Sequence, residues 1–112
     1  MTATEVAPCQ LDAYNAHDLV AFPATYSKNA DLTSLASANR PVIGEGAIAE
    51  LYGTKVFSVA GHRAELPGRM AFGNKVADLE TVFGLGPEPF EVIAVHEVND
   101  HLIERVWFLS AA

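Results

Sequence analysis

Hydrophobic residues in the first half of the chain recur at the spacing of helices. Across Glu5–Asn15 the apolar positions fall three or four residues apart, which predicts an amphipathic helix. Asp18 is a good N-cap for a second, short helix over residues 19–26, in which Pro23 removes one backbone hydrogen bond. Another apolar stripe, in residues 44–61, predicts a third helix.

The second half of the chain alternates between apolar and polar residues with a period of two. Four runs follow this pattern: 62–72, 75–83, 90–98 and 102–109. The first two runs meet across Gly73 and Asn74, a dipeptide suited to a tight hairpin turn. The last two meet in a turn at Asn99, Asp100 and His101. Helices followed by two hairpins in series predict an α+β fold with the helices packed on one face of an antiparallel sheet.

A short strand and a loop are expected between the second and third helices. Ala30–Leu35 has the residues of a strand, and an irregular loop is expected to pass through Asn39, Arg40 and Pro41. No internal repeat, charge block or low-complexity tract interrupts the sequence. The 112 residues therefore predict a single domain over residues 1–112.

The charge balance excludes several classes of partner. Seven Lys and Arg residues against fourteen Asp and Glu residues give a net charge of −7, with no basic cluster, so neither nucleic acid nor an anionic membrane surface is expected as a partner. No apolar run approaches the ~20 residues that span a bilayer. The N-terminal segment carries no basic residue and no apolar stretch, and Cys9, as the single cysteine, cannot form an internal disulfide. We therefore expect a cytoplasmic location.

Three segments of the sequence resemble a known superfamily. They are "YNAHDLVAFPATYSKNADLTSL", "GEGAIAELY" and "VHEVNDHLIERVWF". Their order resembles the ketosteroid isomerase, SnoaL-like polyketide cyclase and nuclear transport factor 2 (NTF2-like) proteins over nearly the whole chain. The resemblance implies an NTF2-like cone, in which N-terminal helices pack inside a strongly curved, mostly antiparallel sheet. It also implies an apolar pocket for a small hydrophobic ligand, and a homodimer.

The catalytic residues of the isomerases in this superfamily are missing from the sequence. Aligned through "NAHDL", the family's oxyanion-donating Tyr falls at Gln10, its proton-shuttling Asp at Ser34 and its protonated Asp at about Ala94. The two supporting tyrosines of some isomerases match Tyr26 and Tyr52. The resemblance therefore implies a related scaffold whose pocket keeps some polar groups, but different chemistry.

Two acidic residues in the run 75–83 are the main candidates for catalysis. Asp78 and Glu80 share one strand face with two valines, and two readings remain open. Either the acids face water, because buried unpaired acids are rare, or they line the cavity, where each raises the pKa of the other. His96, on the next strand, is read either as a base beside these acids or as a hydrogen-bonded core residue.

Aromatic residues supply the candidates for ligand binding. Tyr14, Tyr26, Tyr52 and Phe108 are expected near the ligand, although core packing explains them equally well. Trp107 alternates with Phe108, so the two side chains face opposite sides of the sheet. If Trp107 lies on the convex side, it marks a dimer surface.

Other kinds of site find little support in the sequence. We expect no metal and no cofactor, because the histidines lack paired spacing and no glycine-rich phosphate loop is present. Superfamily epoxide hydrolases use an Asp-Arg-Asp set, which Asp78 and Arg105 could imitate in part. Otherwise Arg63, Arg69 and Arg105 are expected in a solvated ladder of ion pairs with the strand acids.

Two hypotheses for the function follow from these residues. The first is a cofactor-independent enzyme that performs acid–base isomerisation, cyclisation or dehydration on a small hydrophobic carbonyl compound. In it, Asp78 or Glu80 shuttles the proton, His96 assists, and Tyr26 and Tyr52 donate to developing negative charge. The second is a non-catalytic module that binds a lipophilic molecule or a protein partner. A dimer with no ligand is a third reading.

Overall fold

The chain begins with helices and ends with a meander of strands. The computed structural model describes residues 2–35 and 41–110. The helical elements are α1 (Ala3–Asn15), α2 (Ala21–Ala24), α3 (Glu45–Leu51) and a π-helical turn, η1 (Tyr52–Val56). The strands are β1 (Tyr26–Ser34), β2 (Val42–Ile43), β3 (Arg63–Phe72), β4 (Lys75–Phe83), β5 (Phe90–Asn99) and β6 (Leu102–Ser110).

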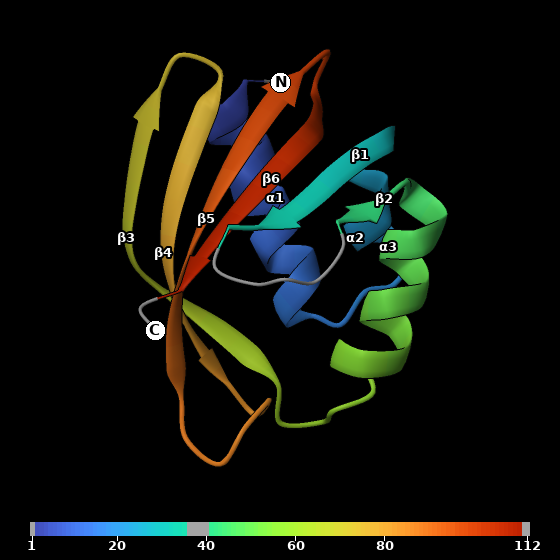
Figure 1. Cartoon of the computed structure of the whole chain (residues 1–112), viewed down its shortest axis with the longest axis vertical. Coiled ribbons are helices and arrows are strands. Elements are labelled where there is room, and N and C mark those ends of the chain that lie inside the picture. The colour runs from blue at the N-terminus through green and yellow to red at the C-terminus, as the bar shows by residue number, and fades with distance from the viewer. Residues whose placement is uncertain (1, 36–40, 111–112) are drawn as a thin grey trace.

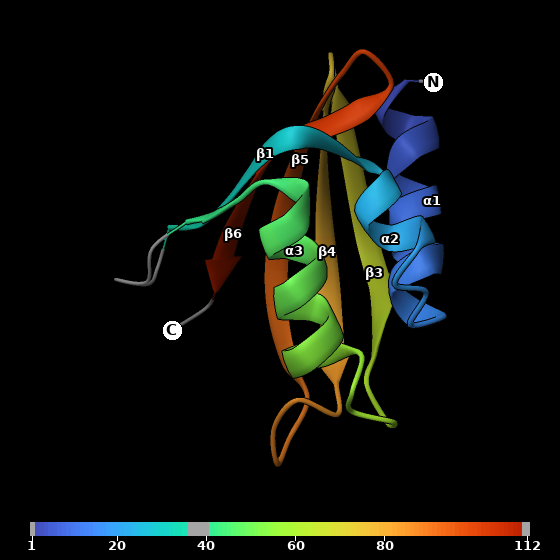
Figure 2. The same cartoon turned by 90° about the vertical axis from the view of Figure 1, so that its right-hand side faces the viewer.

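The strands form an open, curved sheet that wraps around the helices. Its order is β2-β1-β6-β5-β4-β3, with β1 and β6 parallel and the other neighbours antiparallel. The helices gather on the concave side, and no helix of the described residues covers the convex side (Figures 1 and 2). This arrangement confirms the predicted α+β fold. None of the helices within residues 2–35 and 41–110 has the length and apolar character needed to cross a membrane.

Tertiary contacts move several of the predicted element boundaries. The strand expected at Ala30–Leu35 begins at Tyr26 instead, because Tyr26 pairs with Ile103 of β6 and Ile103 N–H donates to the Thr25 carbonyl. The third helix turns π-helical at Tyr52, where the Phe57 N–H reaches back five residues to the Tyr52 carbonyl. Of the expected loop, Asn39 and Arg40 lie outside the described residues.

The "NAHD" segment that follows α1 fixes the end of that helix to the sheet. Asn15 hydrogen-bonds both backbone groups of Ala64 in β3, at 2.9 and 2.7 Å. His17 adopts a φ of 54° and places its Nε2 2.6 Å from the carbonyl oxygen of His62. The Asp18 carboxylate accepts the backbone N–H groups that begin α2, as predicted for a capping residue. These bonds hold α1 across the concave face of the sheet.

Both hairpin turns form where the sequence predicted them. Gly73 takes a φ of 58° between β3 and β4, and the β5–β6 turn places Asp100 and His101 at φ values of 50° and 69°. The first turn sets the register of its hairpin, so that Met70 lies opposite Ala77 and Arg69 opposite Asp78. That register determines which side chains face the helices.

Candidate functional site

The acidic residues of β4 face the inside of the sheet. Along the strand, Val76, Asp78, Glu80 and Val82 are buried while the residues between them are only half-buried. The reading in which these acids face water is therefore wrong. The side chain of Asp78 has no exposed surface at all.

Arg69 explains how Asp78 can be buried. Its guanidinium donates from Nε to Oδ1 at 2.7 Å and from its terminal nitrogen to Oδ2 at 2.9 Å. This bidentate pair supplies the compensating charge that an ionised carboxylate needs away from water. The expected solvated ladder is wrong for Arg69, whose side chain is only 23% exposed. Counting outward from the Gly73-Asn74 turn places Arg69 opposite Asp78, so the sequence did contain the signal for this pair.

His96 lies beside this ion pair without joining it. The Nε2 atom of His96 is 3.8 Å from Oδ2 of Asp78, beyond hydrogen-bonding distance. Within residues 2–35 and 41–110, neither ring nitrogen has a hydrogen-bond partner. Burial lowers the pKa of His96 to about 4, so the ring is neutral at physiological pH. A buried neutral imidazole with free nitrogens can still donate one hydrogen bond and accept another.

Among the described residues, no Lys or Arg forms an ion pair with Glu80. Burial, with the charge of Asp78 as a second cause, raises the pKa of Glu80 to about 7, and the more distant Arg69 lowers it only in part. The two carboxyl groups therefore differ although they lie two residues apart. Both oxygens of Asp78 are bound by Arg69, while Glu80 can gain or lose a proton near neutral pH.

A cavity of about 280 Å³ on the concave side brings Glu80 and His96 together. It is lined by Gln10, Tyr14, Ser34, Tyr52, Glu80, Val82, Leu85, Phe90, Val92, Ala94, His96 and Phe108. Of the candidate ligand-binding residues, Tyr14, Tyr52 and Phe108 thus lie on its wall. Burial raises the pKa of the Tyr14 and Tyr52 hydroxyls well above the usual range, so both remain protonated donors.

Two of the candidate residues lie behind the cavity wall. Asp78 is not among the lining residues, and Tyr26 is 2% exposed in the core. Tyr26 still supports the wall, because its hydroxyl oxygen accepts a hydrogen bond of 3.1 Å from the Gln10 amide. A role for Tyr26 in direct ligand contact is therefore wrong, and its contribution passes through Gln10.

The three positions that replace the isomerase residues all lie on the cavity wall. Gln10 projects from α1, Ser34 from the end of β1 and Ala94 from β5. The alignment through "NAHDL" thus identified the lining of the cavity, although an amide, a hydroxyl and a methyl group stand there. The sequence reasoning treated these positions only as losses, and it missed Gln10 as a polar wall residue.

Trp107 and Arg105 lie on the convex side of the sheet. Trp107 pairs with Val95, which alternates with the inward-facing Ala94 and His96, and the Arg105 guanidinium lies 5.6 Å from the centre of the Trp107 ring. Arg105 therefore cannot complete an epoxide hydrolase set with Asp78.

Asp78, Glu80 and His96 together are also candidate ligands for a metal ion. One ligand atom from each of Asp78, Glu80 and His96 lies within 4.8 Å of the others, and such oxygen and nitrogen donors suit a divalent cation. Arg69 opposes this use, because it already occupies both oxygens of Asp78 and adds positive charge beside them. The cluster fits proton transfer better than metal binding.

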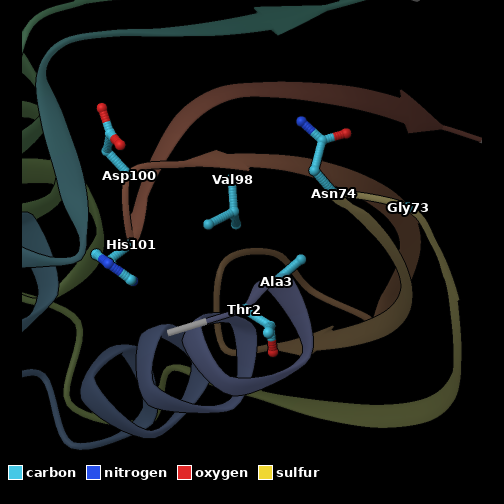
Figure 3. A pocket seen from close by; sticks show the side chains of 7 residues that line it. All are labelled: Thr2, Ala3, Gly73, Asn74, Val98, Asp100 and His101. Carbon is cyan, nitrogen blue, oxygen red and sulfur yellow. The ribbon is translucent and has the colours of Figure 1, made fainter.

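A second hollow, of about 360 Å³, lies between the start of α1 and the turns of the two hairpins (Figure 3). Its polar residues serve local structure. Thr2 and Glu5 form a capping box at the start of α1, and the Asn74 amide donates to Asn99 at 3.1 Å. None of the residues that line this second hollow is a buried titratable group like Glu80 or His96 of the first cavity.

Replacing Arg69 should expose the cost of burying Asp78. We expect Arg69→Met to lower the free energy of unfolding by roughly 3 kcal/mol, because it leaves an uncompensated buried carboxylate. Urea denaturation measures this loss, and Arg69→Met combined with Asp78→Asn should recover part of it. The control is Arg63→Met, which removes an ion pair between Arg63 and Glu65, whose side chains are 51% and 58% exposed. This variant should lower the free energy of unfolding by less than about 1 kcal/mol. Equal losses in the two single variants would contradict the assignment.

Glu80 should make stability fall as the pH rises. Its carboxyl group has a pKa of about 7 in the folded protein against 4.5 as the ordinary value. The folded state therefore holds the proton more tightly, and stability decreases between these two pH values. This pKa difference of about 2.5 corresponds to a loss of roughly 3 kcal/mol in the free energy of unfolding above pH 7. Relative to the wild type, Glu80→Gln should gain stability from about pH 5 to about pH 7 in urea denaturation, and the gain should level off above pH 7.

The exposed Glu65 supplies the control for this measurement, since Glu65→Gln should show no such gain. His96 acts in the opposite direction, because its pKa falls to about 4 and its contribution is lost as the pH decreases. That contribution is common to both proteins and cancels in the comparison. A difference that does not depend on pH would show that Glu80 ionises as an ordinary carboxyl group.

Comparisons with known proteins give similarity in structure alone. Neither a protein-family model nor a curated protein sequence matches the chain. Among solved structures, a cystatin-fold protein from Novosphingobium aromaticivorans has 23% identity and a TM-score of 0.83, with 96% of this chain and 97% of that one covered. An NTF2-like protein of unknown function from Mesorhizobium loti has 15% identity and a TM-score of 0.85, with 98% and 91% covered.

A third similar structure comes from Kribbella flavida and is described as a candidate ketosteroid isomerase. It has 18% identity and a TM-score of 0.84, and the match covers 98% of this chain and 78% of that one. Identities at this level establish the arrangement of the backbone and leave the chemistry open. The chain therefore has the NTF2-like fold that its sequence resemblance predicted.

Proposed function

We propose that this protein binds a small hydrophobic carbonyl compound in the concave cavity and transfers a proton on it without a cofactor. Isomerisation, cyclisation and dehydration are reactions of this kind. The observation that carries the proposal is Glu80, a carboxyl group with a pKa of about 7 on the wall of a mostly apolar cavity. A general base works best when its pKa lies near the working pH. The fold that the chain shares with a candidate ketosteroid isomerase supports this class of chemistry.

The geometry gives each polar group a distinct role. Glu80 takes a proton from the carbon next to the carbonyl and returns it elsewhere on the same molecule. His96, neutral and with free ring nitrogens, can donate to the carbonyl oxygen as negative charge develops there. The protonated hydroxyls of Tyr14 and Tyr52 are further donors on the wall. Asp78 does not shuttle the proton in this scheme, because Arg69 binds both of its oxygens.

Exchange of α-hydrogens in heavy water tests this role without knowledge of the natural substrate. We expect the protein to accelerate deuterium uptake by heptanone at pH 8, followed by nuclear magnetic resonance. Glu80→Gln should reduce that rate by about 10²–10⁴-fold, the usual contribution of a general base, while the dissociation constant from calorimetry changes far less. Glu65→Gln, on the exposed surface of β3, should exchange at the wild-type rate. Equal rates in the Glu80 and Glu65 variants would reject the catalytic role.

A second candidate function is ligand binding without catalysis. It is favoured by Gln10, Ser34 and Ala94, which occupy the cavity wall without the acids and phenol that the isomerase resemblance implies. The same assay separates the two functions. A protein that binds heptanone in calorimetry and accelerates exchange in no variant is a binding module.

We propose further that a second copy of the chain covers the convex face of the sheet. This face presents large apolar side chains to solvent, and no helix of the described residues packs on it (Figure 2). The exposed fractions are 64% for Met70, 58% for Phe72, 40% for Ile93 and 37% for Leu109. An apolar face of this kind, with Trp107 beside it, is typical of a protein interface.

Sedimentation velocity tests the dimer directly. The wild type should sediment as a dimer at micromolar concentration, and Ile93→Glu should sediment as a monomer because it places a charge in the centre of the apolar face. Leu51→Glu is the control, because Leu51 is similarly exposed, at 36%, but belongs to α3 on the other side of the molecule. A wild type that remains monomeric would overturn the proposal.

A further inference from the structure

The cavity has a polar end and an apolar end that differ in burial. His96 and Glu80 are 1% and 9% exposed. At the other end, Leu85 and Phe90 line the same cavity but are 37% and 45% exposed. Polar groups thus lie deep, and large apolar side chains lie where the cavity meets solvent. This is the reverse of an ordinary protein surface, where exposed positions are polar and buried ones apolar.

The direction of this gradient follows β5. Phe90 is the first residue of the strand and His96 the seventh, so about 20 Å of backbone separates them at ~3.3 Å per residue. Val92 and Ala94 line the wall between them. A molecule that contacts both ends is therefore polar at its inner end and apolar at its outer end.

The apolar rim is held in place before any ligand binds. Gly84, next to Leu85, has a φ of 90°, and a Cβ atom there would lie 2.6 Å from the carbonyl oxygen of Gly61. The loop after β4 therefore packs directly on the backbone that precedes β3. Leu85 is presented to solvent by a fixed backbone, which lowers the entropy lost when a ligand covers it.

The charges around the cavity select against anionic ligands. No Lys or Arg is found among the residues that line it in the described part of the chain. The nearby Arg69 is committed to Asp78 by two hydrogen bonds. A carboxylate or phosphate would therefore meet acidic groups without a free cation to bind it.

We infer that the ligand is an amphiphile without an anionic group, which enters with its carbonyl group toward Glu80 and His96 and rests an apolar chain on Leu85 and Phe90. This inference rests on the proposed carbonyl-binding function and adds the orientation, the charge and the rim residues that select for chain length. Leu85 and Phe90 make no contact with the reacting carbonyl in this arrangement. Their effect is on affinity.

A series of straight-chain methyl ketones from butanone to decanone tests the inference by calorimetry. Each added methylene should tighten binding about fourfold while it is buried, since its transfer is worth ~0.8 kcal/mol. The gain should level off once the chain passes the rim. Leu85→Ser should weaken binding of decanone about fivefold and leave butanone unchanged, and Phe90→Ser should act in the same way.

Two matched controls accompany the series. Leu51→Ser changes a similarly exposed leucine, at 36%, that does not line the cavity, and should leave the whole series unchanged. Octanone and octanoate share a chain length and differ in charge, and at pH 8 octanone should bind at least tenfold more tightly than octanoate. Circular dichroism establishes whether each variant is folded. If Phe90→Ser does not fold, the test rests on Leu85→Ser, which lies in a loop.

Three results would overturn the inference. They are an affinity that does not change with chain length, a Leu85 variant that weakens butanone as much as decanone, and octanoate bound as tightly as octanone. These results are independent of the catalytic proposal. Loss of the chain-length gain with intact Glu80-dependent exchange would reject the inference alone. If affinity still rises with chain length but neither the wild type nor any variant accelerates deuterium exchange, only the catalytic proposal is rejected.

Discussion

The ion pair between Arg69 and Asp78 is the interaction on which the interior of this protein depends. A sheet that folds around helices places one face of β4 in a region without water, and that face carries two acids. One buried carboxylate without a partner would cost several kcal/mol. Arg69 meets Asp78 directly across the hairpin and satisfies both of its oxygens. The sheet can therefore curve inward without exposing β4.

The same ion pair creates the contrast that makes the site chemically useful. Because Arg69 is hydrogen-bonded to Asp78, it is more distant from Glu80 and lowers the pKa of Glu80 only in part. Burial is the main cause of the raised pKa of Glu80. Burial lowers the pKa of His96, so its ring remains neutral, and no described residue forms a hydrogen bond with either ring nitrogen. Neighbouring groups with different protonation behaviour are the usual basis of acid–base catalysis. One structural ion pair thus separates the roles of three titratable side chains.

The comparison with the isomerases shows how a scaffold and its chemistry can separate. The positions of the absent catalytic groups still lie on the cavity wall, as Gln10, Ser34 and Ala94. The buried acid of this chain comes instead from β4, together with an arginine from β3. The same fold can therefore carry its buried acid on a different strand.

Local patterns in the sequence determined most of the helices and strands of this fold and the register of the β3–β4 hairpin. The period of two placed Asp78 and Glu80 on one face of β4, and the Gly73-Asn74 turn paired this strand with β3, because side-chain alternation and turn geometry are properties of a few adjacent residues. The tertiary structure alone decided that this face points inward, that β1 runs parallel to β6, and that Glu80 and His96 share a cavity while Asp78 lies behind it. These outcomes depend on desolvation and on contacts with α1 and β6, which are distant in sequence, and no local pattern encodes the sum of such contacts.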